Sequence, residues 1–291
     1  MNKISSICFG CEPLGGTDWG NVDIKAIEHA VNTALDLGLN FFDTAGVYGL
    51  GLSEKRLSRI LGKRRHDVVI ATKGGLRWDQ SESKRKVILK DSSPESIRND
   101  VESSLRRLKL DILPIFYVHW PDSNTKIEDT FFELLKLKNE GKIKSIGCSN
   151  FSAKQLDIAS NVCKIEYVQL PVNILDGPPN KNISEICTNK KIKIIAYNVL
   201  LNGLLTGKFD QNSSFPKNDR RSRLSIFKGS TFLDVLKKVD KLKIEAENVN
   251  NSLAHYSIDW VLKQENIISV VIGIKSTDQI IDNWSVKSNL I

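Results

Sequence analysis

The stretch FFDTAGVYGLGLSE at residues 41–54 joins the end of a strand, a polar turn and the start of a helix. Leu39 to Phe42 form a short apolar run, which predicts a strand buried on both faces. After the turn, Ser53 and the apolar residues that recur behind it at helical spacing predict a helix with Ser53 as its N-cap. Asp43 and Tyr48 therefore leave the same strand end together, in an open turn that has little structural need for either side chain.

The same strand-turn-helix unit recurs along the chain. The eight predicted strands are 4–9, 39–42, 68–71, 113–118, 143–147, 167–170, 193–197 and 268–272, each followed by a helical pattern. Eight repeats predict an α/β fold, a (β/α)8 TIM barrel with a parallel eight-stranded sheet, in a single domain over residues 1–291. An open doubly wound sheet is the alternative, but no G-x-G-x-x-G follows the first strand.

Local signals predict several helix ends. Gly38 and Gly141 stand where C-terminal glycines belong, Ser93-Pro94 supplies an N-cap and a first-turn proline, and residues 152–155 form a capping box. Two long connections do not fit the alternation of strand and helix: the charged segment 78–92 and the polar, basic segment 209–230. Long connections in a compact domain are usually functional, and both follow strands, so we expect them at the barrel face where sites are built.

Composition narrows the classes of function. The 291 residues are 41% hydrophobic and 26% charged, and no apolar run is long enough to cross a bilayer, so we expect no membrane segment. The net charge of +8 comes from scattered basic clusters without interleaved aromatics, which favours small anionic ligands and predicts no nucleic-acid partner.

The cysteines indicate the compartment. Five cysteines are odd in number, which argues against a disulfide framework and predicts a reducing cytoplasmic setting. Cys8 and Cys11 form the one C-x-x-C match, and small residues at a strand end explain them better than a metal pair. We therefore predict no metal site.

Polar residues gather at the ends of the predicted strands and just beyond them, with Gln169 inside the sixth strand and Tyr197 at the end of the seventh. They are Asp43, Tyr48, Lys73, His119, Ser149, Asn150, Gln169, Tyr197 and Lys275. Each has an ordinary structural explanation by itself, such as a turn-capping aspartate or a buried amide bonded to backbone. Because strand ends of a parallel barrel share one mouth, we expect the group to converge there.

The group describes an acid that protonates an oxygen on which negative charge develops. A nearby ammonium favours phenolate, so we expect Lys73 to lower the pKa of Tyr48 from about 10 toward the working range. A buried lysine needs a counter-charge, and Asp43 is the available carboxylate. His119 is then placed to bond the substrate oxygen or to relay the proton.

Five motifs in order along the chain carry a family resemblance. They are DTAxxYGxGxSE at 43–54, ATKG at 71–74, VHWPD at 118–122, GKIKSIGCSNFS at 141–152 and NGLLTGKF at 202–209, with Gln279 and Asn283 continuing the match. The ordered set resembles the aldo-keto reductase superfamily over nearly the whole chain. The resemblance implies an eight-stranded barrel that transfers a hydride from a nicotinamide cofactor to a carbonyl compound.

The resemblance also implies residue roles. Tyr48 would be the general acid, Lys73 would lower its pKa, Asp43 would partner Lys73, and His119 would orient or relay. Ser149, Asn150 and Gln169 would hold the nicotinamide carboxamide, Tyr197 would stack on the ring, and the pyrophosphate would run along Leu200, Gly203 and Lys208. The adenosine end would meet Gly273, Lys275, Thr277, Gln279 and Asn283.

The adenosine end has independent support and one alternative. Ser276 begins a helix after the last strand, and its free N–H groups with Lys275 suit a 2'-phosphate, which predicts NADPH as the preferred cofactor and NADH as the other choice. Residues 276–279 are also a capping box, so the Gln279 side chain has backbone as an alternative partner.

The chain ends bear on the substrate site. Predicted strands begin almost at the N-terminus and few residues follow Asn283, so we expect no N-terminal hairpin plug and a short C-terminal tail. We expect a shallow, open substrate site bordered by Trp19, Trp78 and Trp120, with ordinary packing as the other explanation for these tryptophans.

The sequence thus predicts an NAD(P)H-dependent reductase of a small aldehyde, ketone or keto sugar. The alternative is a cofactor-binding regulatory subunit of the same fold with little turnover, and a cofactor-free barrel isomerase or hydrolase is a third reading. The sequence leaves the substrate, the direction and the oligomeric state open.

Overall fold

Eight parallel strands close into a barrel in the order β1-β10-β9-β8-β7-β6-β3-β2. The computed structural model describes residues 3–78 and 88–286 of the chain. The barrel strands are β1 (Ile7–Gly10), β2 (Phe41–Asp43), β3 (Val69–Gly74), β6 (Leu113–Val118), β7 (Ile143–Ser149), β8 (Tyr167–Pro171), β9 (Lys193–Tyr197) and β10 (Ile267–Gly273). The predicted parallel eight-stranded barrel is confirmed. Its strands begin and end within a few residues of their predicted ranges.

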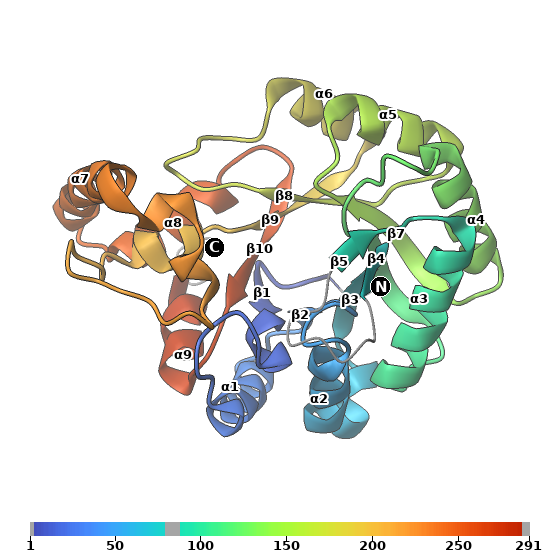
Figure 1. The fold of residues 1–291 in the computed structure, drawn as a ribbon, viewed down its shortest axis with the longest axis horizontal. Helices are drawn as coiled ribbons and strands as arrows, with labels where there is room; N and C mark the ends of the chain where they lie inside the picture. The colour runs from blue at the N-terminus through green and yellow to red at the C-terminus, as the bar shows by residue number, and fades with distance from the viewer. Residues whose placement is uncertain (1–2, 79–87, 287–291) are drawn as a thin grey trace.

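Helices lie outside the ring of strands, and α7 stands at the edge of the molecule (Figure 1). The helices are α1 (Ile24–Asp36), α2 (Leu52–Leu61), α3 (Pro94–Leu108), α4 (Ile127–Asn139), α5 (Ala153–Val162), α6 (Lys181–Lys190), α7 (Gly229–Asn248), α8 (Leu253–Leu262) and α9 (Thr277–Ser285). Short 3₁₀ segments are η1 (Glu12–Gly15), η2 (Gly62–His66), η3 (Leu201–Thr206), η4 (Arg220–Ser222) and η5 (Ser225–Phe227).

Most of the predicted helix ends are correct. Ser93 caps α3 ahead of Pro94, and Ser152 caps α5 with Gln155 in a reciprocal capping box. Gly38 and Gly141 follow α1 and α4 with positive φ values of 85° and 77°, a conformation that glycine adopts without steric cost.

The predicted cap of α2 is wrong. Gly51, with φ of 90°, is the N-cap, and it makes no side-chain capping bond. Ser53 lies inside the first turn, where its Oγ donates to the Cys11 carbonyl at 2.7 Å and lies 2.9 Å from Thr44 Oγ1. A glycine turn starts the helix two residues earlier, which leaves the serine to tie α2 to the ends of β1 and β2.

The segment 78–92, expected to be a loop, contains part of a small hairpin. β4 (Leu76–Trp78) pairs antiparallel with β5 (Ile88–Lys90), outside the barrel sheet. Residues 79–87 of that segment lie outside the described residues. The other long connection, 209–230, holds η4 and η5 and ends in the first turn of α7.

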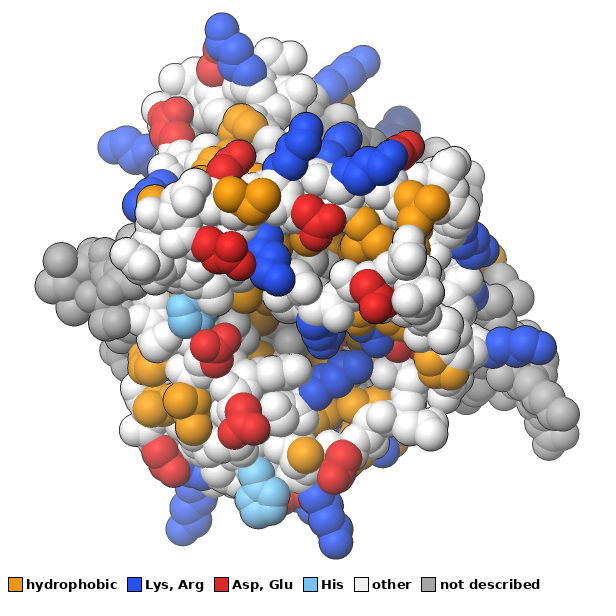
Figure 2. All heavy atoms as spheres, turned by 90° about the vertical axis from the view of Figure 1, so that its left-hand side faces the viewer, with side chains coloured by type: hydrophobic (Ala, Val, Ile, Leu, Met, Phe, Trp, Pro, Cys, Tyr) orange, Lys and Arg blue, Asp and Glu red, His pale blue; other side chains and the backbone are white. Residues whose placement is uncertain are grey.

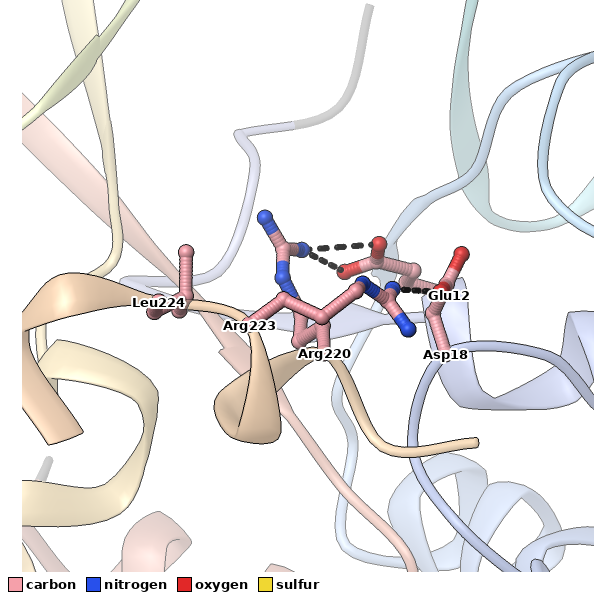
Figure 3. Close-up of a pocket in the computed structure, with 5 residues that line it drawn as sticks. All are labelled: Glu12, Asp18, Arg220, Arg223 and Leu224. Atoms are coloured by element: carbon pink, nitrogen blue, oxygen red, sulfur yellow. Dashed lines mark hydrogen bonds and ion pairs between the residues drawn. The ribbon is translucent and has the colours of Figure 1, made fainter. Parts of the chain in front are cut away.

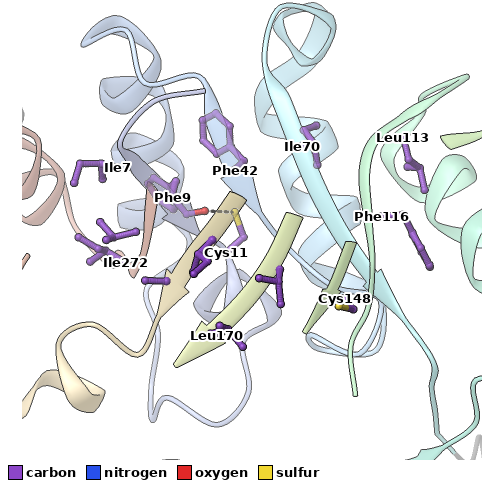
Figure 4. Close-up of a cluster of buried hydrophobic side chains, with 14 of the residues drawn as sticks. Ile7, Phe9, Cys11, Phe42, Ile70, Leu113, Phe116, Cys148, Leu170 and Ile272 are labelled. Atoms are coloured by element: carbon purple, nitrogen blue, oxygen red, sulfur yellow. Dashed lines mark hydrogen bonds between the residues drawn. The ribbon is translucent and has the colours of Figure 1, made fainter. Parts of the chain in front are cut away.

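The largest apolar cluster lies between the strands and the surrounding helices. Figure 4 shows part of it, with Ile7, Phe9 and Phe42 on one side and Leu113 and Phe116 on the other. A second cluster, which includes Cys8, Phe41, Ile115 and Tyr117, fills the barrel interior. Side chains at alternate strand positions thus fill the barrel, so a ligand site must form at its mouth.

Candidate active site

A cavity of about 870 Å³ opens at the carboxyl ends of the barrel strands. Sixteen of the sequence candidates line it: Trp19, Asp43, Tyr48, His119, Trp120, Ser149, Asn150, Gln169, Tyr197, Leu200, Gly203, Lys208, Gly273, Lys275, Gln279 and Asn283. The structure therefore brings together residues from seven of the eight barrel strands or the connections that follow them. Figure 2 shows the face of the molecule on the left of Figure 1, where side chains of both charges are interspersed.

The centre of the site is a buried ion pair beneath a phenol. Lys73 Nζ lies 2.6 Å from Asp43 Oδ2, 3.0 Å from the Thr44 carbonyl and 3.4 Å from Tyr48 OH. The Lys73 and Asp43 side chains are 1% and 4% exposed. β2 and β3 are neighbours in the barrel, which is why the acid and the base meet at this depth.

The expected pKa shift of Tyr48 is wrong in direction. Burial raises the pKa of Tyr48 well above its ordinary value of 10, and the negative charges of Glu12 and Asp43 raise it further. The Lys73 ammonium is already bonded to Asp43, so little of its charge is left to favour phenolate. Tyr48 consequently holds its proton at neutral pH, which suits a donor.

His119 lies against Tyr48 in the same mouth. The two rings are 5.9 Å apart and nearly perpendicular. Burial lowers the pKa of His119 well below 6.5, and the Lys73 charge lowers it further, so the imidazole is neutral. Its Nδ1 is buried and has no hydrogen-bond partner among the described residues, which leaves it available to a ligand.

The residues expected at the nicotinamide form a network with one another. Asn150 Oδ1 accepts from Tyr197 OH at 2.6 Å, and Asn150 Nδ2 donates to the His119 carbonyl and to Ser149 Oγ, both at 3.0 Å. Gln169 Nε2 donates to the second Asp43 oxygen at 2.9 Å. Gln169 thus fixes the carboxylate that holds Lys73, a contact that the sequence analysis did not assign.

Cationic groups gather at the far end of the cavity. Lys275 Nζ donates to the Trp19 carbonyl at 3.0 Å and lies 5.2 Å from the centre of the Trp19 ring. Burial lowers the pKa of Lys275 and of Lys208, and the Arg221 charge lowers both further. Cations that repel one another in this way favour an anionic ligand.

Two details differ from the expected adenosine contacts. Gln279 Oε1 accepts from the Lys275 backbone N–H at 2.8 Å, while Ser276 caps α9. The alternative backbone partner of Gln279 is therefore present, although Gln279 still lines the cavity. Thr277 does not line the cavity.

The three tryptophans occupy different places. Trp19 and Trp120 line the cavity. Trp78 does not; its Cη2 lies close to Gly46, behind the turn that carries Tyr48. Trp120 is 39% exposed and Lys90 of β5 lies 5.0 Å from its ring centre, so the hairpin borders this side of the mouth.

Sequence reasoning missed Glu12 and Arg220, which line the same cavity. Figure 3 shows both oxygens of Glu12 facing Arg220, and Arg220 Nη1 lies 3.0 and 3.2 Å from them. Arg223 pairs with Asp18 beside them. Glu12 lies just beyond β1, so the strand-end position that indicates the other candidates also indicates Glu12.

A second buried carboxylate supports the Tyr48 turn from behind. Glu54 of α2 is fully buried; it accepts from Thr72 Oγ1 at 2.6 Å and pairs with Arg107 of α3. The Arg107 side chain lies against Gly46 and Gly51, where a Cβ atom would meet it at 3.0 and 2.8 Å. The two glycines therefore let the turn close over this ion pair.

The part of the chain that the structure describes holds no metal cluster and no membrane-spanning helix. Within residues 3–78 and 88–286, no group of three or more His, Cys, Asp or Glu side chains is arranged to hold a metal ion. In the same part of the chain, no helix has the length and apolar content to cross a membrane. All five cysteines are buried free thiols.

The fold and site define a barrel enzyme with a protonated phenol, a buried Lys–Asp pair and a neutral imidazole at one cavity. Residues 6–289 match the sequence model of the Aldo/keto reductase family. Aldo-keto reductase YhdN from Bacillus subtilis (strain 168) is 31% identical over 294 residues, which cover 98% of this chain and 87% of that protein. NADH-specific methylglyoxal reductase from Escherichia coli (strain K12) is 30% identical over 279 residues, 92% of this chain and 85% of that protein.

Solved structures agree with these sequence matches. The glycerol dehydrogenase AKR11B4 from Gluconobacter oxydans superposes with a TM-score of 0.87 at 33% identity, covering 99% of this chain and 91% of that one. The chain belongs to the aldo/keto reductase family. It is accordingly an oxidoreductase of the class that uses nicotinamide cofactors and acts on small carbonyl compounds.

Proposed function

We propose that the enzyme reduces the carbonyl of a small aldehyde, ketone or keto sugar, with Tyr48 as the general acid. The observation that carries the proposal is the Tyr48 phenol, half-buried and 3.4 Å from Lys73 Nζ, at the mouth of the cavity. A bound reduced nicotinamide supplies the hydride. Tyr48 then donates its proton to the oxygen on which negative charge develops.

The neighbouring residues support this role of Tyr48. Gln169 holds Asp43, Asp43 holds Lys73, and Lys73 Nζ lies 3.4 Å from Tyr48 OH, where it fixes the position of the phenol. His119 presents an unpartnered Nδ1 in the same mouth and orients the substrate oxygen. Asp43 and Lys73 act through the phenol, whereas Tyr48 and His119 meet the substrate.

The described residues fit a phosphorylated nicotinamide dinucleotide. Ser149, Asn150 and Gln169 offer amide and hydroxyl groups to the carboxamide, and the Tyr197 ring offers a stacking surface. Leu200, Gly203 and Lys208 line the same cavity and are assigned to the pyrophosphate. Gly273, Lys275, Gln279 and Asn283 are assigned to the adenosine end, whereas Thr277 is outside the cavity lining. The cations Lys208 and Lys275, whose pKa values burial and Arg221 lower, favour the extra phosphate of NADPH over NADH.

The experiment begins with the cofactor. NADPH and NADH are titrated separately into the protein, and a panel of aldehydes, ketones and keto sugars is then screened for oxidation of the bound cofactor. We expect tighter binding of NADPH and turnover of at least one carbonyl class. Binding without turnover across the panel would favour the regulatory-subunit alternative, and absence of binding would contradict the proposal.

We also propose a reducing compartment, the cytoplasm, as the setting. The five buried, unpaired thiols favour it, since an oxidising compartment selects for disulfides. Measuring the free thiols of protein purified without reductant tests this point, with five as the expected number.

A further inference from the structure

The 3₁₀ segment η1 is fixed rigidly against the turn that carries Tyr48. The Cys11 N–H donates to the Asp43 carbonyl at 2.8 Å, and the Cys11 carbonyl accepts from Ser53 Oγ at 2.7 Å. At the other end of η1, a Cβ on Gly15 would lie 2.7 Å from Gly49 N and 2.9 Å from Tyr48 C, so the backbones touch. Glu12, between these anchors, therefore has a defined position beside the phenol.

Arg220 reaches Glu12 from the long connection before α7. The Arg220 backbone N–H donates to the Asp18 carbonyl at 2.8 Å, and the guanidinium meets Glu12 as shown in Figure 3. The two side chains are 38% and 30% exposed, and both line the cavity that also holds Tyr48, His119 and Trp120. The pair thus forms a polar wall of the cavity whose charges act on Tyr48.

This wall presents donors and acceptors together. Among the described residues, Arg220 uses only Nη1 in side-chain hydrogen bonds, and its guanidinium carbon lies 5.6 Å from the centre of the Trp19 ring, which leaves its other N–H groups for a ligand. Each Glu12 oxygen also keeps a further lone pair. Burial raises the pKa of Glu12, and Arg220 opposes that rise, which reflects a carboxylate drawn partly out of water next to its counter-ion.

We propose that the Glu12–Arg220 pair selects neutral carbonyl compounds that carry a hydroxyl group beside the carbonyl, an inference that rests on the proposed reductase function. A hydroxyl group donates to Glu12 and accepts from Arg220, and so replaces the water that both groups lose as the substrate enters. An alkyl substrate displaces the same water but offers no hydrogen bond in its place, so Glu12 and Arg220 keep only their bonds to each other. The negative charge of Glu12 repels an anionic 2-oxo acid. Arg220 does not offset this repulsion, because its own charge is already paired with Glu12.

A three-carbon ketone series isolates the effect. Acetone, hydroxyacetone and dihydroxyacetone differ in having none, one or two hydroxyl groups, and pyruvate carries a carboxylate in the same position. The hydroxyl groups also activate the carbonyl electronically. That effect is the same for every enzyme variant, so the informative quantity is the change in the kcat/KM ratio, dihydroxyacetone over acetone, on mutation.

Substituting either member of the pair should lower this ratio. For Glu12→Leu we expect a fall of about 10-fold or more, the size of one lost hydrogen bond to a charged group, and Arg220→Leu should act in the same direction. Glu12→Gln keeps an acceptor and should lose less. The matched control is Arg223→Leu, which breaks the neighbouring ion pair with Asp18 and should leave the ratio within about twofold.

Nicotinamide titration of each variant verifies that the barrel and its cavity have formed. If Glu12→Leu and Arg220→Leu bind cofactor and keep the parent ratio, or if the parent prefers pyruvate, the inference is wrong while the reductase function stands. If the parent protein turns over no carbonyl at all, the proposed function fails and the inference fails with it.

Discussion

Lys73 Nζ and Asp43 Oδ2 lie 2.6 Å apart in a pair that is almost completely buried. Removing one member of such a pair leaves the other as an uncompensated charge, so we expect Asp43→Asn and Lys73→Met each to lower the free energy of unfolding by about 3–5 kcal/mol. In Asp43→Asn/Lys73→Met the loss should be smaller than the sum of the two by about 1 kcal/mol or more. Urea unfolding measures all three, and strictly additive losses would contradict the assigned pairing.

The Glu54–Arg107 pair behind the Tyr48 turn should behave differently from a surface pair. Because Glu54 is fully buried, Glu54→Gln should lower the free energy of unfolding by about 3 kcal/mol or more. The control is Glu28→Gln, which breaks an exposed pair with Arg59 and should cost about 1 kcal/mol or less. Equal losses in the two variants would show that Glu54 does not support the turn.

Lys275 should discriminate between the two cofactors. A hydrogen bond to a charged phosphate is worth about 1.5–3 kcal/mol, so Lys275→Met should weaken NADPH binding about 10- to 100-fold and change NADH binding little. Lys237→Met, at an exposed position on α7, is the matched control. The assignment of Lys275 to the 2'-phosphate is wrong if titration gives the same loss for both cofactors.

The pH profile follows from the directions of two pKa shifts. The pKa of Tyr48 is raised above 10, so the phenol stays protonated as pH rises to 9; the pKa of His119 is lowered below 6.5, so the imidazole stays neutral as pH falls to that value. We expect kcat/KM for carbonyl reduction, at saturating cofactor, to be flat between these limits. An apparent pKa between 7 and 9 that disappears in Tyr48→Phe or His119→Gln would show that one of these groups titrates in the working range.

Much of the fold could be predicted because strand periodicity and helix-end chemistry are local. The capping box at Ser152 and the glycine after α1 were correct for that reason. The cap of α2 was not, because Gly51 takes a positive φ and packs against Arg107 of α3, a contact that has no local sequence signal. The β4–β5 hairpin was not predicted because its two strands are short and the sequence between them is charged.

The site was predictable as a set of residues but not as a network. Strand-end position alone placed Asp43, Lys73 and His119 correctly at one mouth. The sign of the Tyr48 pKa shift depends on burial and on Glu12, and the Gln169–Asp43 bond joins residues 126 positions apart; neither has a local signal. Arg220 likewise lies in a connection whose path the sequence does not reveal.

The central claim is that Tyr48 gives its proton to the substrate oxygen. The most direct test is kcat for carbonyl reduction by Tyr48→Phe beside the parent enzyme, with cofactor affinity measured on both. We predict a kcat about 10²- to 10⁴-fold lower, because a general acid is lost, together with an affinity for NADPH that is little changed. A variant that reduces the carbonyl as fast as the parent would contradict the account.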